Sequence, residues 1–151
     1  MKFSLAASFF CFILSSCSFR NQPYDVVLKT YSNGNPRVTV TYIGKGEFMQ
    51  KVQYVEFYED GKKKKETQYR NGVEHGKSTA WYSNGKEKLV EFYKNGLKDS
   101  LSVFYFEDGR IGSEEFYKMG KIDGNSATYY ENGQQASKAF HQEGKYEGEF
   151  T

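Results

Sequence analysis

The sequence predicts an all-β protein: an elongated, single-layer, twisted antiparallel sheet of stacked β-hairpin repeats, open at both ends. Three observations lead to this fold class. Aspartate- or asparagine-glycine pairs begin at Asp60, Asn84, Asp108 and Asn132, each 24 residues after the one before. An aromatic pair precedes each of them, and the chain holds 13 Tyr and 13 Phe but only 2 Pro. A sustained period of this size is typical of repeat architectures, and aromatic segments punctuated by glycine favour short strands.

The N-terminal residues 1–16 are expected to be a signal peptide. Lys2 precedes an apolar stretch, Phe3 to Leu14, which is too short to span a bilayer as a helix. The stretch leads into Leu14-Ser15-Ser16-Cys17, which resembles the bacterial lipobox. The resemblance implies cleavage before Cys17 and acylation of that cysteine, and several acyl chains anchor a protein stably. A secretory signal without lipidation is the alternative.

Residues 17–30 are expected to act as a tether, although Tyr24 to Leu28 could add an edge strand. Cys11 is the only cysteine besides Cys17, and it lies in the segment that cleavage would remove. The mature protein would then have no internal disulfide and would depend on packing alone. A formal net charge of +2 argues against nucleic acid as a partner, because nucleic-acid binding needs a strong basic field.

The repeats are expected to fill residues 31–151 as about five units. Asparagine-glycine pairs favour two-residue type I′ turns, so Asn84-Gly85 is expected to join strands near residues 77–83 and 86–93. A looser loop, such as residues 94–100, would lead to the next hairpin. The first unit is atypical because 27 residues separate Tyr31 from Tyr58, and the last unit stops at Thr151. Atypical end units are what stacked repeats use as caps.

Aromatic side chains form the main candidate binding surface. Neighbouring residues in a strand point to opposite faces, so each face of the sheet should carry a ladder of rings. Trp81 is the expected hot spot, because tryptophan is enriched at the centres of interfaces. The alternative is that the rings only pack on one another. The candidate partner-binding residues are Trp81, Tyr82, Tyr105 and Tyr129, and further rows are formed by Phe92, Phe116 and Phe140 and by Tyr69, Tyr93 and Tyr117.

Charged and titratable residues predict no catalytic, metal or cofactor site. His75 and His141 are 66 residues apart in the chain, or roughly 25–30 Å along the predicted sheet, too far to share a metal. No nucleophile or phosphate-loop signature is present, so an enzyme is not expected. The one charge run can be a solvated surface that prevents sheets from sticking, or a contact to anionic headgroups or cell-wall polymer. Its members are Lys62, Lys63, Lys64 and Lys65.

The repeat pattern resembles a known family. Tyr82-Ser83-Asn84-Gly85-Lys86, followed by Phe92-Tyr93-Lys94-Asn95-Gly96, is similar to the variant MORN repeat, and the pattern recurs from Tyr58. Many bacterial proteins with this repeat are assigned to the YwqK-family antitoxins. The resemblance covers residues 31–151. It implies an open sheet of stacked hairpins that serves as a binding or scaffolding surface, and it carries over no catalytic residue.

Together these observations predict a lipid-anchored, non-enzymatic binding or scaffolding protein of the bacterial cell envelope. Its partner would be a protein held against the aromatic rows, and its membrane contact would be the lipid anchor. Ser18 after the cysteine does not resemble the aspartate that retains such lipoproteins at the inner membrane in some bacteria, and this favours the outer membrane. One alternative is a toxin-neutralising protein, either an antitoxin or an immunity-type protein. Another is direct binding of peptidoglycan or anionic lipid headgroups. No nucleic acid or small-molecule substrate is expected.

Overall fold

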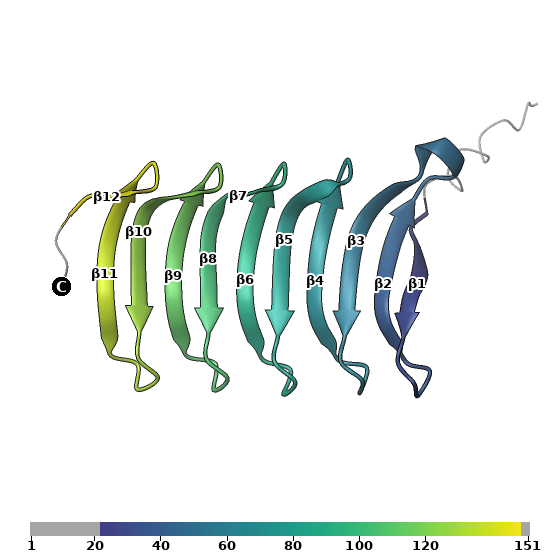
Figure 1. Ribbon diagram of the computed structural model, residues 1–151, viewed down its shortest axis with the longest axis horizontal. Coiled ribbons are helices and arrows are strands. Elements are labelled where there is room, and N and C mark those ends of the chain that lie inside the picture. The colour runs from purple at the N-terminus through teal and green to yellow at the C-terminus, as the bar shows by residue number, and fades with distance from the viewer. Residues whose placement is uncertain (1–21, 149–151) are drawn as a thin grey trace, which may run out of the picture.

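The computed structural model describes residues 22–148, and these form one open antiparallel sheet (Figure 1). The predicted fold class is confirmed, since the hairpins stack side by side in chain order; the short β7 lies off this order and pairs with β6 alone. A single 3₁₀ turn, η2 (Gly46–Phe48), interrupts the described strands. The strands are β1 (Tyr24–Thr30), β2 (Pro36–Ile43), β3 (Gln50–Phe57), β4 (Lys63–Arg70), β5 (Val73–Trp81), β6 (Glu87–Lys94), β7 (Leu97–Lys98), β8 (Ser100–Tyr105), β9 (Ile111–Lys118), β10 (Lys121–Tyr129), β11 (Gln135–Gln142) and β12 (Lys145–Tyr146).

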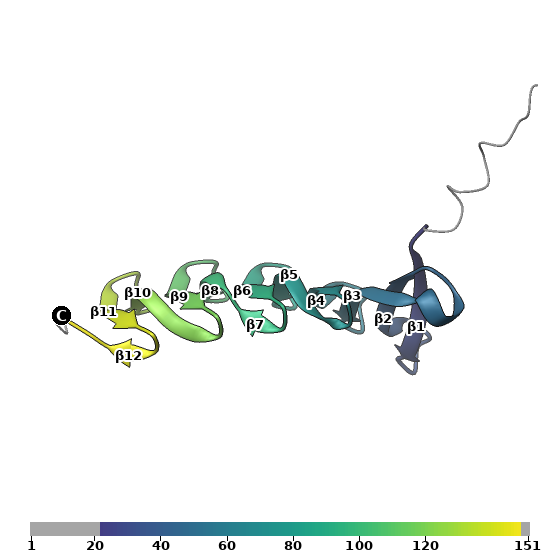
Figure 2. The same cartoon turned by 90° about the horizontal axis from the view of Figure 1, so that it is seen from above.

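The sheet is one layer thick over its whole described length. Seen along its strands, it is a narrow ribbon with no second layer over either face of residues 22–148 (Figure 2). The edge strand that the sequence allowed at Tyr24–Leu28 is present as β1, which extends to Thr30. The prediction that residues 24–30 belong to a tether is therefore wrong. The predicted signal peptide and Cys17 lie outside the described residues.

The two kinds of connection are the reverse of the prediction. At Asn84-Gly85 only the glycine has positive φ, at 88°. Tyr82 N–H donates to Lys86 O at 2.9 Å, and Gly85 N–H donates to Tyr82 O at 3.0 Å. This is a longer turn ending in a glycine bulge, so the type I′ turn predicted here is wrong. The Asn84 Oδ1 accepts the Lys86 N–H at 2.9 Å, and this Asx turn keeps the asparagine at negative φ.

Type I′ geometry occurs instead in the loops that were expected to be loose. Asn95 and Gly96 have φ values of 53° and 81°, both positive as this turn requires. The same pair of positive angles recurs at Asn71-Gly72, Met119-Gly120 and Glu143-Gly144. Met119 and Glu143 thus hold a conformation that favours glycine or asparagine, because Cβ lies close to the following carbonyl oxygen there; glycine lacks a Cβ, and asparagine can hydrogen-bond locally.

The turns form the two long edges of the ribbon. We call one the Asx edge, made of the turns at residues 31–35, 58–62, 82–86, 106–110 and 130–134. We call the other the type I′ edge, made of the connections at residues 44–49, 71–72, 95–96, 119–120 and 143–144. The first of these is the longer connection through η2, and it takes up the extra length of the first unit.

Hydrogen bonds tie each repeat to the next along both edges. On the Asx edge the Tyr58 hydroxyl donates to Trp81 O at 2.7 Å. On the type I′ edge Gly96 N–H donates to Glu74 O at 2.8 Å. Because these bonds recur from repeat to repeat, the stack is held at its margins as well as by the strand ladders.

The two faces of the sheet carry different rows of side chains. Cross-strand partners share a face, and so do alternate residues along a strand. Lys77 and Trp81 lie four residues apart in β5, and Lys77 pairs with Phe92, so Trp81 and Phe92 share a face. The same pairing logic holds in the next two repeats. We name this side the aromatic face, and it carries Trp81, Tyr105, Tyr129, Phe92, Phe116 and Phe140.

The opposite side, which we name the polar face, carries a central row of hydroxyl and carboxylate groups. Burial is confined to the middle of the strands on both sides, where longer neighbours cover short side chains. The buried valines are Val38, Val40, Val55, Val90 and Val103, and Thr79 on the aromatic face is also buried. The central row of the polar face holds Thr67, Ser78, Glu91, Ser102 and Glu115.

Candidate functional site

Three of the four predicted partner-binding residues form one row. Trp81, Tyr105 and Tyr129 are the last residues of β5, β8 and β10, so each stands on the aromatic face beside the Asx edge. All three are half-buried. The Lys63 ammonium lies 6.0 Å from the centre of the Trp81 ring. Burial and then the nearby Glu114 carboxylate raise the pKa of Tyr129.

Tyr82, the fourth predicted residue, lies apart from this row. It begins a turn on the Asx edge, so it is not in a strand beside Trp81. Its hydroxyl donates to Tyr105 O at 2.7 Å, and the Lys88 ammonium lies 5.4 Å from its ring centre. Tyr82 therefore links two repeats. Burial, followed by the Glu107 carboxylate, raises its pKa.

A second row on the aromatic face is the more exposed one. Phe92, Phe116 and Phe140 are 40%, 45% and 47% exposed, one ring per repeat, near the type I′ edge. We name these three side chains the phenylalanine row. Gly124 has positive φ beside Phe116, and a Cβ on it would lie 3.2 Å from the Phe116 Cβ. The 24-residue spacing of this row is visible in the sequence, but its exposure depends on the absence of a layer that covers this face.

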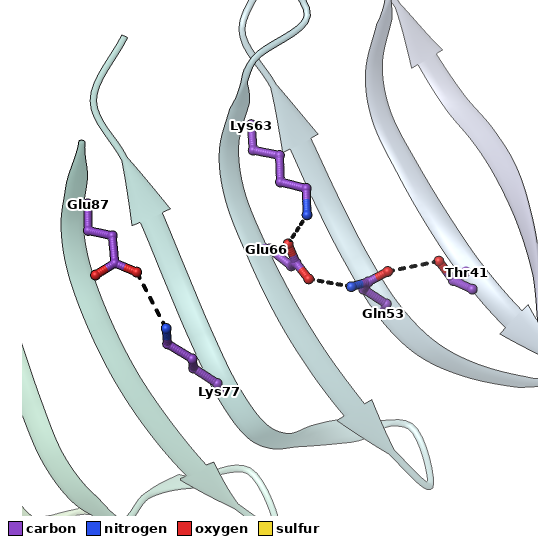
Figure 3. Close-up of polar contacts among 6 residues, drawn as sticks. All are labelled: Thr41, Gln53, Lys63, Glu66, Lys77 and Glu87. Atoms are coloured by element: carbon purple, nitrogen blue, oxygen red, sulfur yellow. Dashed lines mark hydrogen bonds and ion pairs between the residues drawn. The ribbon is translucent and has the colours of Figure 1, made fainter. Parts of the chain in front are cut away.

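The same face is polar toward the N-terminal end of the ribbon (Figure 3). The Thr41 hydroxyl donates to Asp25 Oδ1 at 2.6 Å and lies 3.2 Å from Gln53 Oε1. The Gln53 amide donates to Glu66, which also pairs with the Lys63 ammonium. These contacts run across four strands, so the side chains hold one another in place.

One repeat further, an ion pair crosses the aromatic face. The Lys77 ammonium lies 3.4 Å from Glu87 Oε1 (Figure 3). Lys77 is paired with Phe92 and Glu87 with Trp81, so this pair spans the space between the two aromatic rows. The two side chains are 45% and 42% exposed, and such a pair contributes less than about 1 kcal/mol.

A hollow of about 640 Å³ lies beside the polar part of this face. Gln68, which takes the position that Phe92 has in the next repeat, is one of its walls, with Arg70 and His75 close by. The His75 Nδ1 accepts the Asn95 N–H at 3.4 Å, a contact between repeats. The hollow is open and polar, and the sequence predicted no site here because Gln68 interrupts an aromatic row.

The polar face holds its carboxylates in closed local networks. The Tyr93 hydroxyl donates to Glu91 Oε2 at 3.0 Å, and the Lys98 ammonium pairs with the other Glu91 oxygen. Glu91 is buried, and burial and then this carboxylate raise the pKa of Tyr93. The Tyr117 hydroxyl donates to Glu115 Oε2 at 2.7 Å, and its pKa is raised to about 12 for the same reasons.

The lysine run is engaged with its own neighbourhood on the Asx edge. The Lys62 ammonium lies 2.9 Å from Asp60 Oδ2 and donates to Ser83 O at 3.1 Å. The hydrogen bond from Lys62 lowers the pKa of the exposed Asp60 carboxyl. Lys63 pairs with Glu66, and the Lys64 ammonium lies 5.9 Å from the Tyr58 ring centre. A bulge where Lys63 and Lys65 pair with β3 breaks the simple alternation expected for the run.

Within residues 22–148, no group of three or more His, Cys, Asp or Glu side chains is placed to hold a metal ion. In the same part of the chain, no helix has the length and apolarity needed to cross a membrane.

The fold and the aromatic face define a class: a β-hairpin repeat protein whose single-layer sheet presents side chains on both faces. No protein-family model matches this chain, and neither does any curated protein. The resemblance to variant MORN repeats therefore stays a prediction.

Proposed function

We propose that this chain is a lipid-anchored, non-enzymatic binding or scaffolding protein of the bacterial cell envelope, which holds a protein partner against its aromatic face. The anchor is acylated Cys17, as the lipobox-like sequence predicts. The observation that carries the proposal is the phenylalanine row. Three rings stand nearly half exposed in register on one face, and contiguous exposed apolar surface is typical of an interaction site.

The shape of the face favours an elongated partner. Each repeat advances the sheet by two strands, so successive rings of the phenylalanine row are roughly 10 Å apart. An α-helix with an apolar residue at every seventh position repeats at about 10.5 Å, from 7 × 1.5 Å. An amphipathic helix lying across the strands would therefore meet one ring per two turns. The half-buried row of Trp81, Tyr105 and Tyr129 would line its other side.

The polar face supports a non-enzymatic role for the protein. Glu91 is buried between the Tyr93 hydroxyl and the Lys98 ammonium, and Glu115 accepts the Tyr117 hydroxyl. Carboxylates satisfied in this way act as local structural groups, because their partners lie on the same or the adjoining strand and neither carboxylate is held ready for a substrate.

Crosslinking in intact cells tests the proposal. The full chain, carrying a C-terminal tag, would be compared with the double variant Phe92→Ala/Phe116→Ala and with Trp81→Ala. A central aromatic residue of an interface contributes at least about 2 kcal/mol, so each variant should lose roughly 30-fold or more of the captured partner. Tyr130→Ala is the matched control, because Tyr130 is an exposed ring on the Asx edge.

The folded state of each variant would be checked by circular dichroism before capture is compared. Equal capture by the wild type and by both aromatic-face variants would refute the protein-binding role. The anchor is tested separately: Cys17→Ser should move the protein from the membrane to the soluble fraction, and mass spectrometry of the native N-terminus should find acylated Cys17.

A further inference from the structure

The exposed apolar side chains in the turns gather on one long edge of the ribbon. Phe48, Met49, Val73, Leu97 and Met119 are all exposed, and all lie in or directly beside the connections of the type I′ edge. Phe48 and Met119 are 75% and 72% exposed, higher than any other large hydrophobic residue of the described chain. The turns of the Asx edge and the residues that flank them expose only Tyr130 and Ile111 among large hydrophobic side chains, again within residues 22–148.

The direction of the chain also distinguishes the two edges. The described chain enters the sheet at the type I′ edge, because Tyr24 opens β1 opposite Tyr42 near the end of β2. The Tyr24 hydroxyl lies 3.0 Å from the Met49 sulfur, in the first connection of that edge. Cys17 precedes Gln22 by five residues, which span at most about 18 Å when extended. An acyl anchor at Cys17 would therefore keep this edge, and not the Asx edge, close to the bilayer.

We propose that the ribbon stands on the membrane along its type I′ edge, with Phe48, Leu97 and Met119 inserted into the lipid headgroup region. This inference rests on the lipid anchor in the proposed function, but not on the protein partner. One apolar tip per connection, repeated from η2 to the turn at Met119, matches the planar surface of a bilayer. Apolar side chains that enter the lipid headgroup region add to the membrane binding that the acyl chains supply.

This orientation has two consequences for the rest of the protein. The strands would point away from the membrane, so the polar and aromatic faces would both be open to the surrounding compartment. The Asx edge would lie farthest from the bilayer, one strand length of eight residues or roughly 27 Å away. The lysine run Lys62–Lys65 lies at that far edge and would not contact the headgroups.

Tryptophan fluorescence quenching by brominated lipid tests the orientation. The full chain would be reconstituted into vesicles of phosphatidylethanolamine and phosphatidylglycerol with brominated acyl chains. Trp81 is the only tryptophan of the chain, so Trp81→Phe provides a background without signal. Single probes would then be introduced by Phe48→Trp, Met119→Trp, Phe116→Trp and Tyr130→Trp, with circular dichroism confirming that each variant is folded.

The expected result is at least about twofold quenching of the probes at residues 48 and 119, and almost none at residue 130. The quenching should persist at about 0.5 M salt, because apolar insertion is not screened. Strongest quenching at residue 116 would mean that the ribbon lies flat on its aromatic face. Strongest quenching at residue 130, lost in salt, would mean that the lysine edge faces the lipid. Either result, or no quenching at any position, overturns the proposal. Loss of the partner in the crosslinking experiment leaves these outcomes unaffected.

Discussion

Ser100 occupies a backbone position that the other repeats reserve for glycine. Its φ is 81°, while Gly76, Gly124 and Gly148 at the equivalent positions have φ values of 98°, 124° and 134°. A left-handed backbone costs a non-glycine residue roughly 1–2 kcal/mol. A glycine at this position avoids that cost but loses more conformational entropy on folding, which offsets roughly 0.5–1 kcal/mol of the gain. We therefore expect Ser100→Gly to stabilise the fold by about 0.5–1 kcal/mol, the difference between these two effects.

The change is measured by urea unfolding of the full chain, followed by the fluorescence of Trp81, which lies in β5, separated from β8 by β6. A gain of this size raises the midpoint of thermal unfolding by about 2–4 °C for a domain of this length. Ser102→Gly is the matched control, since Ser102 lies in the same strand, is buried and has negative φ. It should destabilise the fold by about 1 kcal/mol, because glycine weakens a strand interior.

Gly124→Ser reverses the experiment in a neighbouring repeat. It should destabilise the fold by more than about 1 kcal/mol, because φ is 124° and the new Cβ would lie 3.2 Å from the Phe116 Cβ. If Ser100→Gly destabilised the protein as much as Ser102→Gly, backbone strain at this position would not be the reason for the glycine pattern.

The remaining predictions concern tyrosines. Tyr82→Phe should destabilise the fold by about 0.5–1.5 kcal/mol in urea unfolding, because the Tyr105 carbonyl loses its donor. Phe106→Tyr should stabilise the wild-type fold by a similar amount, since Phe106 takes the equivalent turn position without a hydroxyl. An unchanged unfolding midpoint for both variants would contradict the role of these hydroxyls. Stability should also fall at alkaline pH. The folded-state pKa values of Tyr54 and Tyr117 are raised to about 12, and that of Tyr93 is also raised, above the ordinary value of 10. Their contribution is therefore complete below pH 10 and is lost as the pH rises toward 12. Parallel urea titrations from pH 9 to 12 check this, and a flat profile would contradict it.

The sequence predicted that aromatic rows would form the candidate surface, but it did not predict which rings are exposed. The sequence shows aromatic rows at a 24-residue period, and Trp81, Tyr105 and Tyr129 do share a face and a row. Exposure could not be read in the same way. Trp81 is less exposed than Phe116, because it ends its strand beside Lys63 and Glu87. Phe116 lies beside a bulge glycine and is 45% exposed.

Tyr82 shows why adjacent aromatic residues mislead. An alternation rule places neighbours on opposite faces of a strand, but β5 ends at Trp81 and Tyr82 already belongs to the turn. The Tyr82 N–H donates to the Lys86 carbonyl and so closes the turn, which ends the strand at Trp81. The hydroxyl of Tyr82 then reaches 23 residues along the chain to Tyr105, a partner that only stacking of the repeats brings near.

The sequence by itself determined the repeat period, the hairpins and the open single sheet, because glycine turns and aromatic strands are local preferences repeated at a constant interval. It did not determine which asparagine-glycine pairs form type I′ turns. That depended on whether the asparagine side chain captured a backbone N–H, as Asn84 does, or left its own backbone at positive φ, as Asn95 does. The tertiary structure also decided which rings are exposed and which edge carries the apolar tips, since both follow from how one repeat covers the next.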